Sequence, residues 1–422
     1  MRIWYVFSSF PAPTETFAGS DVRVLRELGA EVRAVNLRFD HRSSPELLRQ
    51  WGLDDLDLDR VTIGKLVLGL WTMLGRPRLV AWLCGVILAD NWRHPLHVLK
   101  SLLALPRVFD LHARLASDPP DVLHLFWGHY SSLLGLLVRR THPEVVVTVF
   151  LGAYALRTGY ASSARLARIG HGVFTHAIAN RILLTELGVP AETVHVSYRG
   201  VDLQRVPARA AHSGCRLSTV GKLCAEKGMA EVLEVFAAVR REVPAAELAV
   251  IGDGPQRREL EDVVRTAGLA GVEFTGYLPH GEILERLSRT DVLIFLSRKE
   301  SECLPNVVKE AMAAGCACVV SRTWGIEELV QHGETGFVVE PTDVTGAARH
   351  VITLLRDPAL REKMATRARD QIARHFDARR SMARYLAIWQ RAAGSTVTPV
   401  ARTPAAAGER CARRPSSKKV AG

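Results

Sequence analysis

The sequence has few cysteines and no long apolar run, and both shortages exclude whole classes of protein. Its seven cysteines are an odd number without the paired spacing of a metal site, so a reduced, cytosolic chain is expected. The most apolar stretches, 66–75 and 79–89, are shorter than the ~18 residues of a membrane span and are separated by Arg76-Pro77-Arg78. The apolar run 3–7 is too short for a signal peptide. We therefore expect neither a membrane-spanning nor a secreted, disulfide-stabilised protein.

The chain has fewer acidic residues than basic ones. The chain has 55 Lys and Arg against 44 Asp and Glu, a net charge of +11. Residues 394–422 contribute a surplus of five, and this Ala-, Pro- and Arg-rich tail is predicted to be disordered. The remaining charge suits anionic ligands or an anionic membrane surface, and a nucleic-acid role rests only on the tail. With 422 residues, 48% of them hydrophobic, the chain is long enough for two domains with separate cores.

The most informative stretch is 291–320, which predicts strand, loop, helix and strand. The apolar run 292–296 is too short for a helix, and Gly315 ends a segment of good helix formers. Pro305 fits the first turn of that helix, so the backbone N–H groups of Asn306 and Val307 should point out of its N-terminus. Such a terminus attracts phosphate.

Two glutamates flank this predicted anion site. Glu302 lies in the loop, and Glu310 lies about one turn into the helix, roughly 6 Å along the axis at ~1.5 Å per residue. A carboxylate accepts two hydrogen bonds from a vicinal diol, so one glutamate could hold a ribose and the other a sugar, on either side of a diphosphate. The alternative is that Glu302 is a solvated loop charge and that Glu310 is only favoured by the helix dipole. Spacing alone leaves both interpretations open.

The pattern of Glu302, seven residues and Glu310, followed by Ala-Met-Ala-Ala-Gly at 311–315, resembles the signature of the GT-B retaining glycosyltransferases of the family-4 type. The resemblance implies two Rossmann-like domains that face a cleft, with a C-terminal helix that crosses back to the first domain. It also implies that Glu302 binds the donor sugar, that Glu310 binds the ribose, and that amides between them hold the distal phosphate. The donor-binding positions of this segment are then Glu302, Leu304, Pro305, Asn306, Val307 and Glu310.

The first half of the chain alternates short apolar runs with helical patterns, which predicts a parallel sheet covered by helices. The loop 10–17 follows the first predicted strand, at the end where open α/β sheets bind ligands. Its sequence Phe-Pro-Ala-Pro-Thr-Glu-Thr-Phe resembles the FP..SETF loop of exopolysaccharide and colanic-acid-type glycosyltransferases, with Thr14 in place of Ser. The loop residues expected near the donor or the acceptor are Glu15, Thr16, Phe17, Trp127 and Gly152.

Two further loops follow the predicted strands 121–126 and 145–151 and should open on the same edge of the sheet. Many family-4 enzymes carry a His and an Asp in the second loop, where Leu151 and Ala155 stand here. A His-assisted contact to the donor sugar would then come from His124 or His129 of the neighbouring loop. For either histidine a structural role, as a neutral side chain at a strand end, is an equal alternative.

A glycine-bounded loop with two lysines follows the predicted strand 216–220. Lys222 and Lys227 suit a diphosphate, each as a mobile point charge, and they match the paired basic residues of the family, normally Arg and Lys. The turn 252–255 looks like a dinucleotide fingerprint, but Pro255 and Arg257 break that pattern, so NAD binding is rejected. In relatives the segment after the next strand lies against the base. The nucleotide-binding positions expected here are Gly221, Lys222, Lys227, Gly254, Tyr277 and Leu278.

Residues 61–116 contain apolar helices with interspersed Arg, Lys and His. One interpretation is a basic, amphipathic face that rests on an anionic membrane to reach a lipid-linked acceptor. The other is a set of ordinary helices packed on the sheet. In either case the last helix is expected to kink or break at Pro106.

Together these patterns predict an α/β protein whose first domain is 1–202 plus the helix 378–393, whose linker is 203–213, and whose second domain is 214–377. The expected reaction moves a sugar, with retention and without a metal, from a UDP- or GDP-type sugar nucleotide to a glycan or polyprenyl-diphosphate-linked acceptor. No cofactor and no specific nucleic acid are expected, and the protein is placed in bacterial polysaccharide biosynthesis, in the cytoplasm or at the inner face of the plasma membrane. The expected catalytic residues are Glu302, Lys222, Lys227 and His124.

Several alternatives remain. A glycoside hydrolase also uses two carboxyl groups, one of them with a raised pKa. Glu310 beside a positive helix terminus should stay ionised, which favours holding hydroxyls instead. Charge on a leaving diphosphate would then be met by the lysines and the helix N-terminus, since no Asp-x-Asp metal motif appears in a comparable loop. A sugar-nucleotide epimerase, a phosphorylase and a non-catalytic nucleotide-sugar-binding protein are the other candidates.

Overall fold

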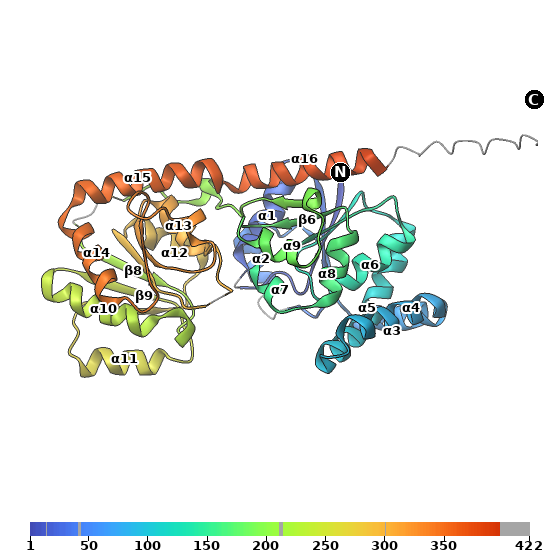
Figure 1. The fold of residues 1–422 in the computed structure, drawn as a ribbon, viewed down its shortest axis with the longest axis horizontal. Coiled ribbons are helices and arrows are strands. Elements are labelled where there is room, and N and C mark those ends of the chain that lie inside the picture. The colour runs from blue at the N-terminus through green and yellow to red at the C-terminus, as the bar shows by residue number, and fades with distance from the viewer. Residues whose placement is uncertain (14, 41–43, 211–213, 300, 397–422) are drawn as a thin grey trace, which may run out of the picture.

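Two parallel sheets, each covered by helices, make up the protein (Figure 1). The computed structural model describes residues 1–13, 15–40, 44–210, 214–299 and 301–396. Thr14 and residues 397–422 of the basic tail lie outside these ranges, whereas residues 394–396, which were predicted to belong to that tail, continue the last helix.

The first sheet has seven strands in the order β3-β2-β1-β4-β5-β6-β7. Its strands are β1 (Arg2–Phe7), β2 (Glu31–Asn36), β3 (Asp57–Asp59), β4 (Val122–Leu125), β5 (Val146–Phe150), β6 (Gly172–Thr175) and β7 (Val194–Val196). The helices of this part are α1 (Thr16–Glu27), α2 (Ser44–Trp51), α3 (Ile63–Leu74), α4 (Pro77–Asn91), α5 (Pro95–Ser117), α6 (Ser131–Thr141), α7 (Ala153–Arg157), α8 (Ala161–Ile169) and α9 (Asn180–Glu186).

The second sheet has six strands in the order β10-β9-β8-β11-β12-β13. Its strands are β8 (Arg216–Val220), β9 (Glu247–Ile251), β10 (Val272–Gly276), β11 (Val292–Phe295), β12 (Ala317–Ser321) and β13 (Phe337–Val339). The helices are α10 (Met229–Glu242), α11 (Arg257–Thr266), α12 (His280–Ser288), α13 (Asn306–Ala314), α14 (Val344–Arg356), α15 (Pro358–His375) and α16 (Ala378–Thr396). The predicted α/β class with two Rossmann-like halves is confirmed.

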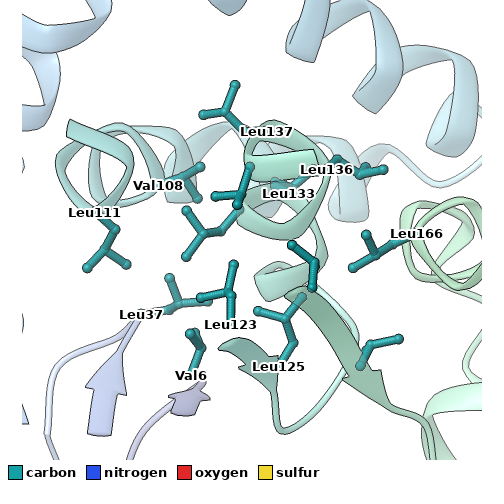
Figure 2. Packing of buried hydrophobic residues seen from close by; sticks show 14 of the residues in the cluster. Val6, Leu37, Val108, Leu111, Leu123, Leu125, Leu133, Leu136, Leu137 and Leu166 are labelled. Atoms are coloured by element: carbon teal, nitrogen blue, oxygen red, sulfur yellow. The ribbon is translucent and has the colours of Figure 1, made fainter. Parts of the chain in front are cut away.

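Alternate residues of β1 enter two separate cores, one on each face of the first sheet. Trp4 and Val6 belong to the core that α4, α5, α6 and α8 cover, whereas Tyr5 and Phe7 belong to the core under α1, α2 and α16. Figure 2 shows the first of these cores, where leucine and valine side chains of the strands meet those of the covering helices. Burial on both faces explains why β5 is apolar at four of its five positions instead of alternating.

The final helix α16 returns to the first domain, as predicted, and runs along the top of Figure 1. Tyr385 and Trp389 are buried in the core on that face of the first sheet. The Tyr385 ring stacks on Phe174 at 3.9 Å between centroids, and Trp389 Nε1 donates a hydrogen bond to Thr148 Oγ1 (3.0 Å). These contacts fasten α16 to the first sheet.

The expected break at Pro106 is wrong, since α5 runs through this residue from Pro95 to Ser117. Helix α3 packs directly against the proline, and a Cβ on Gly69 would lie 1.7 Å from Pro106 O. This close packing supports α5 at the residue where the proline removes a helical hydrogen bond. Within the described residues no single helix is long and apolar enough to span a bilayer, and α3 with α4 passes that test only as a pair bent by 103°.

Candidate active site

Helix α13 presents an open N-terminus between the two predicted glutamates. Pro305 precedes the first turn, and the first helical hydrogen bond runs from Lys309 N to Pro305 O (3.3 Å). The backbone N–H groups of Asn306 and Val307 therefore lie outside the helical ladder, at the positive end of the helix. Leu304 is buried beside them. This geometry suits a phosphate.

Glu302 and Lys227 form one charge cluster at the carboxyl ends of β8 and β11. The Glu302 carboxylate accepts hydrogen bonds from Lys227 Nζ and from Ser297 Oγ (2.9 Å to the latter). The two charged side chains are only 15% and 18% exposed, and Lys227 Nζ lies 5.4 Å from the centroid of the Phe295 ring. A diphosphate entering here could replace Glu302 as the partner of Lys227 and leave the carboxylate for sugar hydroxyls.

Glycine brings the loop of Lys227 against the end of β11. Gly228 has a φ of +66°, and a Cβ there would lie 2.0 Å from Leu296 O, so no other residue fits. Arg298 N also donates a hydrogen bond to Glu226 O (2.8 Å). These contacts fix Lys227 beside Glu302.

The other predicted nucleotide positions surround this loop. Lys222 is exposed, so the structure places only Lys227 of the lysine pair in the charge cluster. A Cβ on Gly254 would lie 2.4 Å from Leu223 O, which shows how closely the turn of Gly254 packs on the loop that begins at Gly221. Tyr277 is exposed, whereas Leu278 is half-buried against the core of the second domain.

Glu310 faces the first domain. Its Oε1 shares a hydrogen bond with His280 Nε2 (2.9 Å), and its side chain is 13% exposed. Together with Asn306 it lines a pocket of about 30 Å³ whose opposite wall includes Thr16 and Phe17. That volume is far below the several hundred Å³ of an ordinary ligand pocket, so a nucleotide at Glu310 needs a wider space between these walls.

The predicted loops of the first domain meet at one edge of its sheet. Trp127 Nε1 donates a hydrogen bond to Glu15 Oε1 (3.1 Å), and burial raises the pKa of Glu15. A Cβ on Gly152 would lie 3.3 Å from the Trp127 ring. Thr16 and Phe17 were expected in a loop, but they form the first turn of α1. The helix begins earlier than predicted because backbone hydrogen bonds already form at its start, for example from Ala18 N to Glu15 O (2.9 Å).

A buried charged cluster joins the two domains beneath this edge. Arg199 lies among aromatic rings, with its guanidinium carbon 4.0 Å from the Phe150 centroid and 4.2 Å from that of Phe126. Its Nε is 3.2 Å from the Asp21 carboxylate, and Lys309 Nζ donates a hydrogen bond to Arg199 O (2.9 Å). Burial raises the pKa of Asp21 to about 6 and lowers the pKa of Lys309 to about 7.

A second contact between the domains is made by Glu328. Its carboxylate accepts hydrogen bonds from the backbone N–H groups of Ile178 (2.7 Å) and Ala179 (2.8 Å) and from the Tyr198 hydroxyl (3.0 Å). A carboxylate of the second domain thus caps a turn of the first domain.

The position expected for His124 is wrong. It was placed at a loop of the cleft, but it lies inside β4, fully buried among the rings of Tyr5, Phe174 and Trp389. Its Nδ1 contacts Thr148 Oγ1 (2.9 Å), and burial lowers its pKa well below the ordinary value. The structure therefore gives no support to a catalytic role for His124.

Sequence reasoning missed Lys309, Arg199, His280 and His176. A signal existed for Lys309, because it lies in a helical segment whose other residues, apart from Asn306 and Glu310, are apolar. His176 is half-buried, and its buried Nδ1 has no hydrogen-bond partner among the described residues. It lies beside Gly152, where an added Cβ would be 3.0 Å from its Cε1. Burial lowers its pKa to about 3, so the ring is neutral. His176, not His124, is the histidine at this loop.

Among the described residues, no group of three or more His, Cys, Asp or Glu side chains is arranged to hold a metal ion. The charged groups that converge near the N-terminus of α13 are those of Lys227, Glu302 and Glu310. Their chemistry is that of binding hydroxyls and an anion.

Comparisons with known proteins agree with this arrangement. The family model described as Glycosyl transferases group 1 matches residues 211–371. Glycogen synthase of Mycobacterium tuberculosis is 31% identical over 304 residues, which cover 70% of this chain and 66% of that protein. A putative colanic acid biosynthesis glycosyltransferase of Salmonella typhimurium, WcaL, is 29% identical over 203 residues, which cover 46% of this chain and 50% of that protein. The aligned regions thus fall short of two thirds of these relatives' lengths.

The fold has solved counterparts. The crystal structure of HepE from Anabaena in complex with UDP superposes with a TM-score of 0.67 and 17% sequence identity, over 94% of this chain and 99% of that one. At this identity the likeness concerns the fold, and it covers both sheets and the helix that crosses between them. The chain therefore belongs to the group 1 glycosyl transferases and has the GT-B fold.

Proposed function

We propose that this protein transfers a sugar from a nucleoside-diphosphate sugar to a glycan or lipid-linked acceptor in polysaccharide biosynthesis. The observation that carries the proposal is the open N-terminus of α13 with Glu302 on one side and Glu310 on the other, at the boundary between the domains. The structure of HepE with UDP and the name of WcaL support a nucleotide-sugar donor and a polysaccharide product.

In this proposal the diphosphate lies at the N–H groups of Asn306 and Val307. Lys227 balances the charge that develops on the diphosphate as the bond to the anomeric carbon breaks, and the exposed Lys222 joins it when the donor is bound. Preorganised donors at a helix terminus stabilise such charge without reorganisation during the reaction. Neither a metal nor another cofactor is required by this scheme.

Glu302 then holds hydroxyls of the donor sugar and Glu310 those of the ribose. We propose that the acceptor hydroxyl attacks from the face that the diphosphate leaves, so that the new bond keeps the anomeric configuration without a covalent enzyme intermediate. The bond from the anomeric carbon to the diphosphate oxygen breaks, the bond to the acceptor oxygen forms, and the acceptor proton passes to the departing phosphate. His280 positions the Glu310 carboxylate through its hydrogen bond.

The test begins with a screen of UDP and GDP sugars for thermal stabilisation, followed by turnover assays with the donor that binds. Glu310→Ala should abolish transfer and leave the circular dichroism spectrum unchanged, and near-normal transfer would refute the assignment. Lys222→Ala combined with Lys227→Ala should weaken binding of the nucleoside diphosphate in calorimetry. NMR of the anomeric proton identifies retention, and product analysis separates transfer from epimerisation, phosphorolysis or binding alone.

A further inference from the structure

Helices α3, α4 and α5 form an arm that projects from the first domain (Figure 1), and its outer surface is apolar. Of the nineteen large hydrophobic residues that are exposed in the described part of the chain, twelve lie between residues 63 and 103. Trp71 is 69% exposed, Trp92 is 67% exposed and Leu103 is 70% exposed. Such a concentration marks a surface that contacts an apolar partner.

The arm is rigid because its inner face is packed. Gly69 of α3 lies against Pro106 of α5, and Leu105 and Val108 of α5 are buried in the core of the first domain. Leu103, on the opposite side of α5, faces outward. The two interpretations of this segment from sequence therefore apply to opposite faces, one packed on the domain and one presented to a partner.

The arm is also basic. Between residues 60 and 107 the sequence has seven Lys and Arg residues and a single acidic residue, Asp90, which is paired with Arg165 (2.5 Å). Arg78, Arg93 and Lys100 are exposed, and none of them is ion-paired with a carboxylate in the part of the chain that the structure describes. Arg93 lies 4.9 Å from the centroid of the exposed Trp92 ring, so charge and aromatic surface occur together.

A groove of about 680 Å³ runs from the arm to the carboxyl ends of β1 and β2. Its walls include Leu66, Lys100 and Leu103 of the arm together with Arg38, Phe39 and Tyr130 of the sheet edge. Three cationic residues, Arg38, Lys100 and the buried Arg107, thus line the groove together with Asp40, whose carboxylate lies 3.3 Å from Arg60 Nε. The groove leads to the edge at which Glu15 and Trp127 lie.

We propose that the outer face of the arm docks on an anionic lipid bilayer and that the groove admits the phosphorylated head of a lipid-linked acceptor. The second part rests on the proposed function. Exposed tryptophans next to Arg and Lys are the combination that binds the headgroup region of a membrane, where rings enter the interface and cations meet anionic lipids. The bend of 103° between α3 and α4 keeps the two helices from forming one spanning segment, so the arm lies on the bilayer.

The charge of the arm favours a bilayer over a second copy of the chain. A symmetric dimer through this face would bring two sets of exposed cations together without acidic partners, which is unfavourable. An anionic bilayer supplies the opposite charge over a broad surface.

Vesicle sedimentation tests the docking. The protein should bind vesicles of phosphatidylcholine mixed with phosphatidylglycerol much more strongly than phosphatidylcholine alone, and salt should weaken the binding. Trp71→Ser with Leu74→Ser should lower the partition coefficient about 10-fold or more. The matched control is Val263→Ser with Ile169→Ser, which removes exposed apolar groups elsewhere and should leave binding unchanged.

The second part of the test uses a charge variant. Arg78→Glu with Arg93→Glu should abolish the preference for phosphatidylglycerol, whereas Arg258→Glu on α11 should not. Binding of wild-type protein that is equal on neutral and anionic vesicles, or unaffected by the Trp71 and Leu74 changes, would overturn the docking proposal. Dimerisation through the arm, seen as loss of a dimer in sedimentation velocity when Trp71 is changed, would also overturn it.

The groove is tested with a polyprenyl phosphate added to phosphatidylcholine vesicles. Arg38→Glu should remove the gain in binding due to polyprenyl phosphate and keep the gain due to phosphatidylglycerol. If Arg38→Glu removes both of these gains in binding, or neither of them, the groove assignment is refuted. Glu310→Ala should bind vesicles like the wild type, and the Trp71 and Leu74 variant should bind the nucleoside diphosphate in calorimetry like the wild type. Failure of the docking and failure of the proposed activity therefore give different results.

Discussion

Replacing Lys309 with Met tests whether a buried amine joins the two domains. Lys309 is 1% exposed, and its Nζ donates a hydrogen bond to Arg199 O. Met keeps much of the length and apolar volume of the side chain but removes the titratable group. Lys363→Met, on an exposed position of α15, is the matched control for removing a lysine.

The magnitude follows from the pKa. Burial lowers the pKa of Lys309 from 10.5 to about 7, and the neighbouring Arg199 adds to the effect. Because the unfolded chain then binds more protons than the folded chain between these values, stability rises with pH across that window. The whole shift corresponds to about 5 kcal/mol, and the interval from pH 7 to pH 9 to about 2 kcal/mol.

The assay is urea unfolding at pH 7, 8 and 9, followed by circular dichroism, with the wild type and both variants compared at each pH. Lys309→Met also loses a hydrogen bond, which costs about 1–2 kcal/mol at every pH. The free energy of unfolding of the wild type relative to Lys309→Met should therefore increase by about 2 kcal/mol from pH 7 to pH 9. Other groups titrate in both proteins, so their effects cancel in this difference.

A difference that stays constant from pH 7 to pH 9 would refute the reasoning. It would mean that the amine is hydrated when the protein is folded and that Lys309 is not packed against Arg199. A pH-dependent difference that also appears with Lys363→Met would equally show that the effect does not come from burial.

Three further outcomes are expected. Asp21→Asn should remove the loss of stability that the wild type shows as the pH rises from about 4 to about 6. In that range the raised pKa of the buried carboxyl makes the folded state bind more protons than the unfolded state, and the same unfolding assay measures the effect. Trp389→Ala should destabilise the first domain by about 3–5 kcal/mol, seen in thermal unfolding, because it empties a fully buried site. Glu302→Gln should lower kcat far more than it changes the affinity for free nucleoside diphosphate, and an equal effect on both would contradict its assignment to the sugar.

Local sequence patterns were sufficient for the elements that build the site. The run 292–296, Pro305 and Gly315 define a strand, a helix start and a helix stop by properties of a few neighbouring residues, and α13 lies where they indicate. The return of α16 could be predicted only through the family resemblance. Its buried Tyr385 and Trp389 give no indication of which sheet they pack against until the fold is known.

Contacts between distant segments were not predictable in this way. Lys227 and Glu302 are 75 residues apart, and they meet because β8 and β11 are neighbours in the sheet. His124 was misplaced for a related reason. The predicted strand 121–126 contained this residue, but the local sequence does not show that the aromatic residues of α16 cover its ring and keep it away from the cleft.

The position of Lys309 next to Glu310 connects the donor site to the contact between the domains. Consecutive residues of a helix point about 100° apart, so α13 presents Glu310 to the pocket of Thr16 and Phe17 and directs Lys309 toward Arg199. A rigid helix cannot move one of these groups without the other. Any separation of the domains that admits a nucleotide at Glu310 must therefore stretch or break the hydrogen bond from Lys309 to Arg199. Protonation of the amine below about pH 7 weakens the same closed arrangement, because a charged group gains by exposure to water. In the proposed function, donor entry and acidification would therefore both weaken the contact between Lys309 and Arg199.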